Sequence, residues 1–183
     1  MKRTAQLDAD MDQPSLQQQR TESTFVLIGR KEVPLGTTEL DLSYHGLTAL
    51  PESIGKLQAL TTLDVKFNQL TELPAAICSL AALTTLIVGN NKLKQLPAEI
   101  GSLAALTELN VSYGNQLTEL PAAIGNLAAL TTLHVRGNQL TELPATIGSL
   151  AALTELNVSD HQLTELPAAI GSLAALMRLN VGS

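Results

Sequence analysis

The chain has 183 residues, a length typical of one domain, and 45% of them are hydrophobic while only 2% are aromatic. Its formal net charge of −6 at pH 7 argues against a nucleic-acid partner, which needs a basic surface, and against an anionic membrane. Cys78 is the single cysteine, so the chain cannot form an internal disulfide. The simplest interpretation is a reduced thiol in a cytoplasmic protein.

Residues 1–22 are polar and contain Gln13 and Gln17–Gln19 among scattered charges. This composition predicts a flexible segment with little fixed structure. It lacks the apolar core of a signal peptide, and no later run is long enough to span a bilayer. We therefore expect a cytoplasmic location, or delivery into a host cytoplasm if the protein is a bacterial effector.

Residues 23–36 are predicted to form an N-terminal cap strand and a connector. The stretch Thr24–Ile28 is the only strongly β-prone piece outside the repeats described next. We expect it to pair with, or fold over, the open end of the first repeat, with Phe25 as the plug. Residues 29–36 would then connect this cap to the first repeat.

Residues 37–183 consist of copies of one 23-residue unit, which start at residues 37, 60, 83, 106, 130, 153 and 176. A full copy reads L-x-x-L-x-[VL]-x-x-N-x-L-x-x-L-P-x-x-I-x-x-L-x-x. The fourth copy has one extra residue near Tyr113–Gly114, and the seventh stops after its strand. A fixed period of this size predicts a stacked solenoid of six full repeats plus a seventh strand.

Each copy is predicted to contain a strand, a turn and a short helical or 3-10 piece. In the second copy, Leu63 and Val65 would face the core, while Asp64 and Lys66 face outward. A proline recurs at one place, where it suits a corner or a first helical turn. The predicted fold class is α/β, with a curved parallel sheet on the concave face and the helical turns on the convex face.

One polar position recurs in the turn that follows each strand. It is occupied by His45, Asn68, Asn91, Asn115, Asn138 and His161. An amide can bond the backbone of its own turn and of the next, so we expect a buried column that satisfies loop backbone. Histidine at the two outer positions is interpreted as a tolerated replacement.

These copies resemble the leucine-rich repeat family over residues 37–183. Their length and the motif Leu-Pro-x-x-Ile-x-x-Leu are similar to the intracellular Ras-suppressor-like and bacterial subclass. The resemblance implies a curved solenoid that binds another protein on its concave face. The sequence also lacks a nucleophile elbow, a phosphate-binding glycine loop and a metal-spaced Cys/His cluster. We therefore expect no enzymatic activity, no cofactor and no metal ion.

The outward strand positions and the position just before the asparagine column are predicted to bind the partner. The candidate residues are Tyr44, Asp64, Lys66, Phe67, Tyr113, His134, Arg136 and Asp160. Tyrosine, phenylalanine and arginine are enriched among interface anchors. In the alternative interpretation the aromatic residues only shield the asparagine column, and the charges form a neutralised surface pair.

Three hypotheses about function follow. The first is an intracellular protein–protein interaction module with a rigid concave surface. The second is the recognition domain of a larger effector or signalling enzyme, truncated after residue 183. The third and smallest is ice binding through a threonine column formed by Thr38, Thr61, Thr84, Thr107, Thr131 and Thr154. We also expect that the open C-terminal end can pair with a second copy of the chain, because it exposes a sheet edge.

Overall fold

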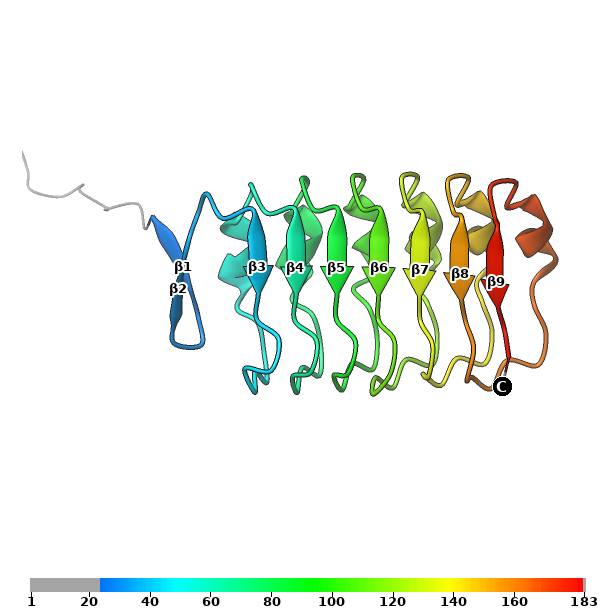
Figure 1. The fold of residues 1–183 in the computed structure, drawn as a ribbon, viewed down its shortest axis with the longest axis horizontal. Helices are drawn as coiled ribbons and strands as arrows, with labels where there is room; N and C mark the ends of the chain where they lie inside the picture. The colour runs from blue at the N-terminus through cyan, green and yellow to red at the C-terminus, as the bar shows by residue number, and fades with distance from the viewer. Residues whose placement is uncertain (1–23, 183) are drawn as a thin grey trace, which may run out of the picture.

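A computed structural model gives the structure of residues 24–182. These residues form a seven-stranded parallel sheet, a row of 3-10 helices behind it, and a separate two-stranded hairpin at one end (Figure 1). The predicted flexible segment, residues 1–22, lies outside the described residues. No helix in the described part of the chain is both long and apolar enough to cross a membrane.

The strands of the sheet follow one another in chain order, one per repeat. They are β3 (Glu39–Asp41), β4 (Thr62–Asp64), β5 (Thr85–Ile87), β6 (Glu108–Asn110), β7 (Thr132–His134), β8 (Glu155–Asn157) and β9 (Arg178–Asn180). The central leucine of each strand faces the same leucine of the next, as with Leu109 and Leu133 across the inserted residue of the fourth copy. The predicted parallel sheet is confirmed, and the insertion is absorbed in the turn without a change of register.

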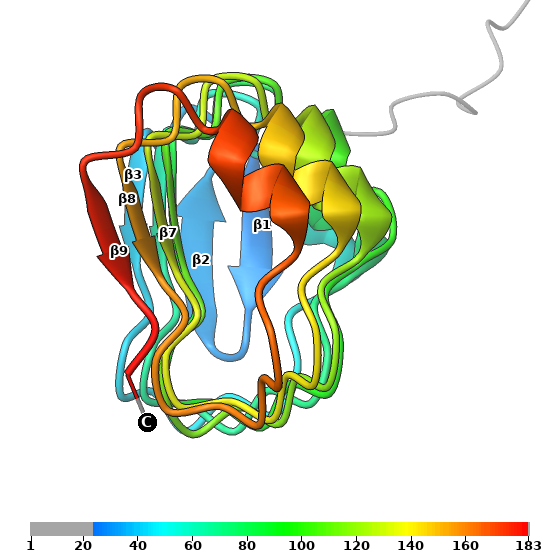
Figure 2. The ribbon, with the colours of Figure 1, turned by 90° about the vertical axis from the view of Figure 1, so that its right-hand side faces the viewer.

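Short 3-10 helices cover the opposite side of the stack (Figure 2). They are η1 (Glu52–Lys56), η2 (Ala75–Ser79), η3 (Ile100–Ser102), η4 (Ala122–Asn126), η5 (Ala145–Ser149) and η6 (Ala168–Ser172). In five of the six, a proline in the extended conformation is the residue directly before the helix. Since proline fixes φ and has no N–H to donate, it turns the chain from the loop into the helix without losing a hydrogen bond.

The core lies between the sheet and the helices and runs the length of the stack. Within the second copy Leu63, Val65, Leu70, Ile77 and Leu80 are all fully buried. Burying one such side chain contributes about 1.5–3 kcal/mol. Because each copy has only one layer of its own, this burial comes from the copies on either side.

In four of the six 3-10 helices, η1, η3, η4 and η5, a glycine near the end lets the next helix approach closely. A Cβ added at Gly148 would lie 2.5 Å from the carbonyl oxygen of Ala169 in the next helix. Cys78 takes the glycine position in η2, and the helix that follows, η3, is only three residues long. Burial, and then the charge of Glu99, raises the pKa of the Cys78 thiol to about 11. The thiol therefore stays protonated at neutral pH, as expected of an unreactive buried cysteine.

The N-terminal end of the stack is covered by a hairpin of β1 (Phe25–Ile28) and β2 (Lys31–Pro34). The residues expected to act as a connector therefore include a second strand. The hairpin is a sheet of its own and does not extend the parallel sheet (Figure 1).

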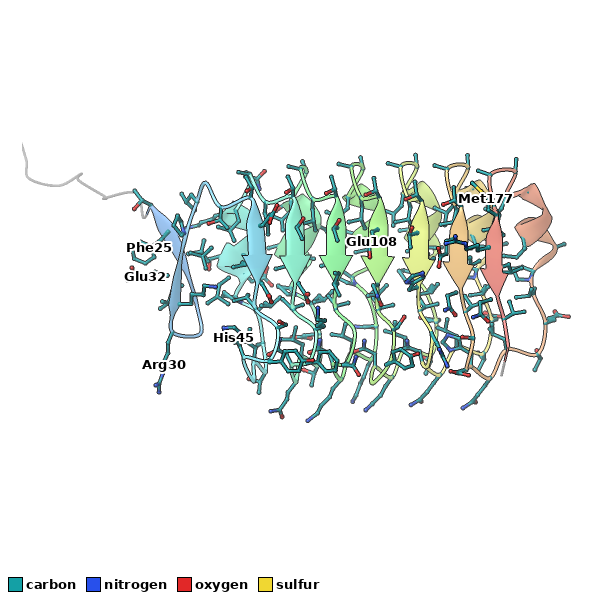
Figure 3. All side chains as sticks on the ribbon, viewed as in Figure 1. Phe25, Arg30, Glu32, His45, Glu108 and Met177 are labelled. Carbon is teal, nitrogen blue, oxygen red and sulfur yellow. The ribbon has the colours of Figure 1, made fainter. Side chains whose placement is uncertain are left out.

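Phe25 does not plug the end of the stack, so this prediction was wrong. Its side chain is 37% exposed and points away from the repeats (Figure 3). Val26, Ile28 and Val33 are instead buried. Successive side chains of a strand point to opposite faces, so a hairpin that turns Val26 inward must turn Phe25 outward.

Candidate functional site

The asparagine at the turn after each strand ties two copies together. The side-chain oxygen of Asn68 accepts hydrogen bonds from the N–H groups of His45 (3.1 Å) and Leu47 (2.9 Å). Its nitrogen donates to the carbonyl oxygens of Leu42 (2.8 Å) and Val65 (2.9 Å). One amide therefore satisfies backbone groups of its own turn and of the turn before it.

The next three asparagines repeat this arrangement. Asn91, Asn115 and Asn138 are buried, and each donates to at least one carbonyl of its own copy and to one of the preceding copy. Each also accepts a hydrogen bond from a leucine N–H of the preceding copy. The column holds the turns at a fixed spacing, which makes the adjoining surface rigid.

The two histidines differ from the asparagines and from each other. His45 is exposed at the turn below β3, where its Nδ1 lies 2.7 Å from the carbonyl oxygen of Ser43 (Figure 3). It is not part of the buried column as expected, because the neighbour on that side is the hairpin rather than a repeat with a turn to bond.

His161 performs only part of the role of an asparagine. Its Nδ1 accepts the N–H of Leu140 at 3.3 Å, which places the proton of the neutral ring on Nε2. Nε2 is buried and has no hydrogen-bond partner among residues 24–182. Burial lowers the pKa of His161, outweighing the opposite effect of the nearby carbonyls of Val135 and Asn138. An unpaired buried donor costs stability.

The position just before the column has a left-handed backbone in every copy from the first to the sixth. Its residues are Tyr44, Phe67, Asn90, Gly137 and Asp160, together with Tyr113 in the fourth copy, and their φ angles lie between 53° and 67°. In that copy Gly114, which is also left-handed, stands between Tyr113 and Asn115. We call them the left-handed row. Glycine and asparagine adopt this conformation readily, whereas a bulky side chain there is uncommon.

The aromatic side chains of the left-handed row are exposed and make contact with one another or with a cation. The rings of Tyr44 and Phe67 stack with centroids 4.4 Å apart and an interplanar angle of 11°. The Cζ atom of Arg136 lies 5.1 Å from the centroid of the Tyr113 ring. Arg136 Nε also donates to Asp160 at 2.6 Å, a bond that raises the pKa of the guanidinium. The stacked rings of Tyr44 and Phe67 and the pair of Arg136 and Tyr113 therefore present two flat surfaces beyond the ends of the strands.

Two further charge clusters lie on the outward side of the strands, which we call the sheet face. Lys66 donates to Asp64 at 2.7 Å, and this contact raises the pKa of Lys66. Glu155 pairs with His134 and with Arg178, at 3.0 Å in each case. The hydrogen bond from His134, then that from Arg178, lowers the pKa of Glu155.

Glu155 and Arg178 were not among the predicted residues. They occupy the first position of their strands, two residues before the outward positions that the sequence analysis considered. The alternation of a strand could have identified them, because residues two apart share a face.

A shallow hollow of about 260 Å³ lies on the sheet face over β5, β6 and β7. Its lining includes Lys66, Ile87, Gly89, Tyr113, His134 and Arg136. Four of the eight predicted partner-binding residues therefore line it, and Tyr44, Asp64, Phe67 and Asp160 do not. No aspartate or glutamate of the described chain contributes to the lining.

The threonine column has a clear structural role. The hydroxyls of Thr61, Thr84, Thr107, Thr131 and Thr154 each donate to the carbonyl oxygen of the threonine one copy earlier, at 2.9–3.0 Å. These hydroxyl protons are used within the stack. Within residues 24–182, no group of three or more His, Cys, Asp or Glu side chains is placed to hold a metal ion.

Comparison with known proteins agrees with this architecture. A family model described as a leucine-rich repeat region matches residues 39–116 and 111–183. A comparison with curated proteins found no match. Among solved structures, a leucine-rich repeat protein of Leptospira interrogans is 33% identical with a TM-score of 0.68, and the match covers 77% of this chain and 42% of that one.

Two other structures extend the comparison. An internalin (InlF) of Listeria monocytogenes is 24% identical with a TM-score of 0.72, covering 80% of this chain and 42% of that chain, and it shows the fold alone. The leucine-rich repeat ectodomain of the Arabidopsis thaliana membrane receptor kinase GASSHO1/SCHENGEN3 was solved in complex with Casparian strip integrity factor 2. It is 36% identical with a TM-score of 0.66, covering 74% of this chain and 17% of that chain.

The matched part of each of these structures is less than half of its length. The family match, by contrast, spans every repeat of the present chain, from β3 to its last strand. The chain belongs to the leucine-rich repeat family.

Proposed function

We propose that this chain is a protein–protein interaction module that docks its partner on the sheet face. The observation that carries the proposal is the set of exposed aromatic and arginine side chains at one edge of that face. Tyr44 stacks on Phe67, and Arg136 lies over Tyr113. Such side chains are the usual anchors of protein interfaces.

The rigidity of the stack supports the same proposal. The asparagine column and the parallel strands hold each rung at a fixed spacing, so the surface loses little conformational entropy on docking. The plant receptor ectodomain, solved in complex with Casparian strip integrity factor 2, supports a partner-binding role for the repeat. Membership of the 23-residue intracellular subclass, a cytoplasmic location, and the lack of nucleic-acid and membrane partners stay predictions from the sequence.

A second candidate is that this module is the recognition part of a larger protein. The observation in its favour is that the solved structures it resembles are longer, with at most 42% of each covered. Self-association through the open C-terminal end, where Leu179 of β9 and the following Val181 are exposed, also stays a prediction. We do not extend the ice-binding hypothesis, because the threonine hydroxyls donate within the stack.

Affinity capture from native lysate tests the proposal. The unmodified chain is compared with a sheet-face variant, Ile87→Lys/Thr132→Lys, and with a helix-face control, Ala122→Lys/Ala145→Lys. All four positions are partly or fully exposed, and both variants add two positive charges. We expect a protein that is retained by the unmodified chain and the control but lost from the sheet-face variant. If the captured protein is instead retained by the sheet-face variant and lost from the helix-face control, the partner docks on the helices and the proposal is refuted.

A further inference from the structure

Stability of the fold does not explain why aromatic residues occupy three positions of the left-handed row. Asn90 and Gly137 show that the same backbone position accepts residues suited to positive φ. Tyr44, Phe67 and Tyr113 adopt it against the usual preference of bulky side chains. These three residues stay between 40% and 70% exposed, so burial offsets little of this cost. Strained residues of this kind are found at binding sites.

One position in the lining of the hollow beside this row has no room for a side chain. Its floor includes Gly89, where an added Cβ would lie 2.6 Å from the carbonyl oxygen of Ser112. Ile87 provides an apolar wall. An incoming side chain therefore meets a lining that is partly apolar.

Lysine, histidine and arginine side chains line the hollow, although the protein is acidic overall. Lys66 lies on one side, and His134 and Arg136 lie on the other, with no carboxylate between them. Each of the three bonds to a carboxylate outside the lining, on Asp64, Glu155 and Asp160. Lys66 gives one of its three hydrogens to that bond, and Arg136 uses Nε, which leaves its two Nη groups as further donors. Exposed ion pairs are weak, so an incoming carboxylate can share these donors.

Resting on the proposed function, we propose that the partner docks through an extended peptide segment that crosses the ends of the strands. A glutamate or aspartate of this segment places its carboxylate in the hollow, between Lys66 and Arg136. Apolar or planar side chains of the same segment pack on Phe67 and Tyr113.

The spacing of the row predicts the spacing of the peptide side chains. Phe67 follows β4 and Tyr113 follows β6, so the two are separated by two strand spacings, or about 9.5 Å. An extended chain in the polyproline II conformation advances about 3.1 Å per residue and returns to the same face at every third residue. The two packed side chains of the partner are therefore expected about three residues apart, with the acidic residue near them.

Selection from a phage-displayed library of short random peptides tests this specificity. The full chain is the bait, and Phe67→Asn/Tyr113→Asn is the parallel bait, because Asn90 already takes this conformation in the same row. We expect the unmodified chain to enrich peptides with an acidic residue and two apolar residues at that spacing, and the variant not to enrich them. The melting temperature of the variant should equal or exceed that of the unmodified chain. A clear fall would show that the aromatic residues are structural and would overturn the inference.

A synthetic peptide of the enriched sequence then tests the hollow itself. Changing its acidic residue to the amide should weaken binding by about tenfold or more, since a charge-assisted hydrogen bond is lost. Lys66→Gln/Arg136→Gln should bind both peptides equally weakly. Lys56→Gln/Lys94→Gln, which removes the same charge from exposed positions outside the hollow, should preserve the difference.

The outcomes separate this inference from the proposed function. Enrichment of peptides without an acidic residue, or no enrichment at all, would overturn the inference. So would a Lys66→Gln/Arg136→Gln variant that binds the acidic peptide as tightly as the unmodified chain does. If the lysate partner is nevertheless lost from the Ile87/Thr132 variant, the interaction module stands and only the chemistry of its partner is wrong.

Discussion

The two ends of the described stack bury the same repeat positions to very different extents. In the first copy Leu40 and Leu42 are 4% and 1% exposed beneath the hairpin. Their equivalents in the last copy, Leu179 and Val181, are 41% and 47% exposed. The residues are alike and their strands have the same register, so the difference comes from the neighbour. Burial in this fold is a property of a pair of adjacent copies, not of the repeat motif.

The test with the largest expected effect replaces the central strand leucine by alanine in two different copies. Leu133→Ala, in β7 between two full copies, is expected to lower the free energy of unfolding by about 3–5 kcal/mol, because a fully buried side chain leaves a cavity. Leu179→Ala in β9 should cost about 1 kcal/mol or less. Urea denaturation followed by circular dichroism measures both. Equal losses would mean that the end copy is as tightly packed as the interior.

A second test uses the glycines at the same position of two adjacent helices, Gly148 in η5 and Gly171 in η6. Gly148→Ala places a Cβ 2.5 Å from the carbonyl oxygen of Ala169, and such overpacking should cost about 1–3 kcal/mol. At Gly171 a Cβ would meet nothing within 4 Å. Gly171→Ala should therefore be neutral or stabilise by about 0.5 kcal/mol, through the lower entropy of the unfolded chain. Melting temperatures measure both effects. A fall in melting temperature for Gly171→Ala as large as that for Gly148→Ala would contradict this prediction.

A third test concerns the asparagine column, which is complete in the interior and incomplete at the sixth copy. His161→Asn should raise the free energy of unfolding by about 1 kcal/mol, because an asparagine amide can donate to the backbone carbonyls as in the other copies. The buried Nε2 of His161, by contrast, has no partner among the described residues. His45→Asn is the control and should change little, because His45 is exposed. A lower melting temperature for His161→Asn would argue against the role assigned to the column.

The smallest expected effect is a pH dependence from His161. Its pKa is lowered in the folded state, so the unfolded chain binds a proton more readily below about pH 6.5. Stability should therefore fall as the pH drops below this value, until the lowered pKa is passed. The difference between the unmodified chain and His161→Asn, in melts from about pH 8 to about pH 5, isolates this histidine from the others. A difference in melting temperature between the two proteins that stays constant with pH would refute the pH dependence predicted for His161.

The repeat motif by itself determined the architecture. The spacing of Leu63, Val65, Asn68 and Leu70 predicts a strand followed by a polar turn, and each side chain adopts the predicted role. The prediction succeeds because every copy meets the same neighbours, so that local pattern and tertiary environment repeat with the same period. The family and the seven parallel strands followed from this pattern alone.

Only the tertiary structure decided the features where that periodicity is broken. The face of the hairpin that turns inward, the exposure of His45, and the hollow above Gly89 depend on what lies beside each residue in space. The charge cluster that joins His134 and Arg178 through Glu155 links side chains 21 and 23 residues apart in the chain. Such contacts are set by rotamers and by the adjacent rung, and a repeat motif specifies neither for the positions it leaves variable.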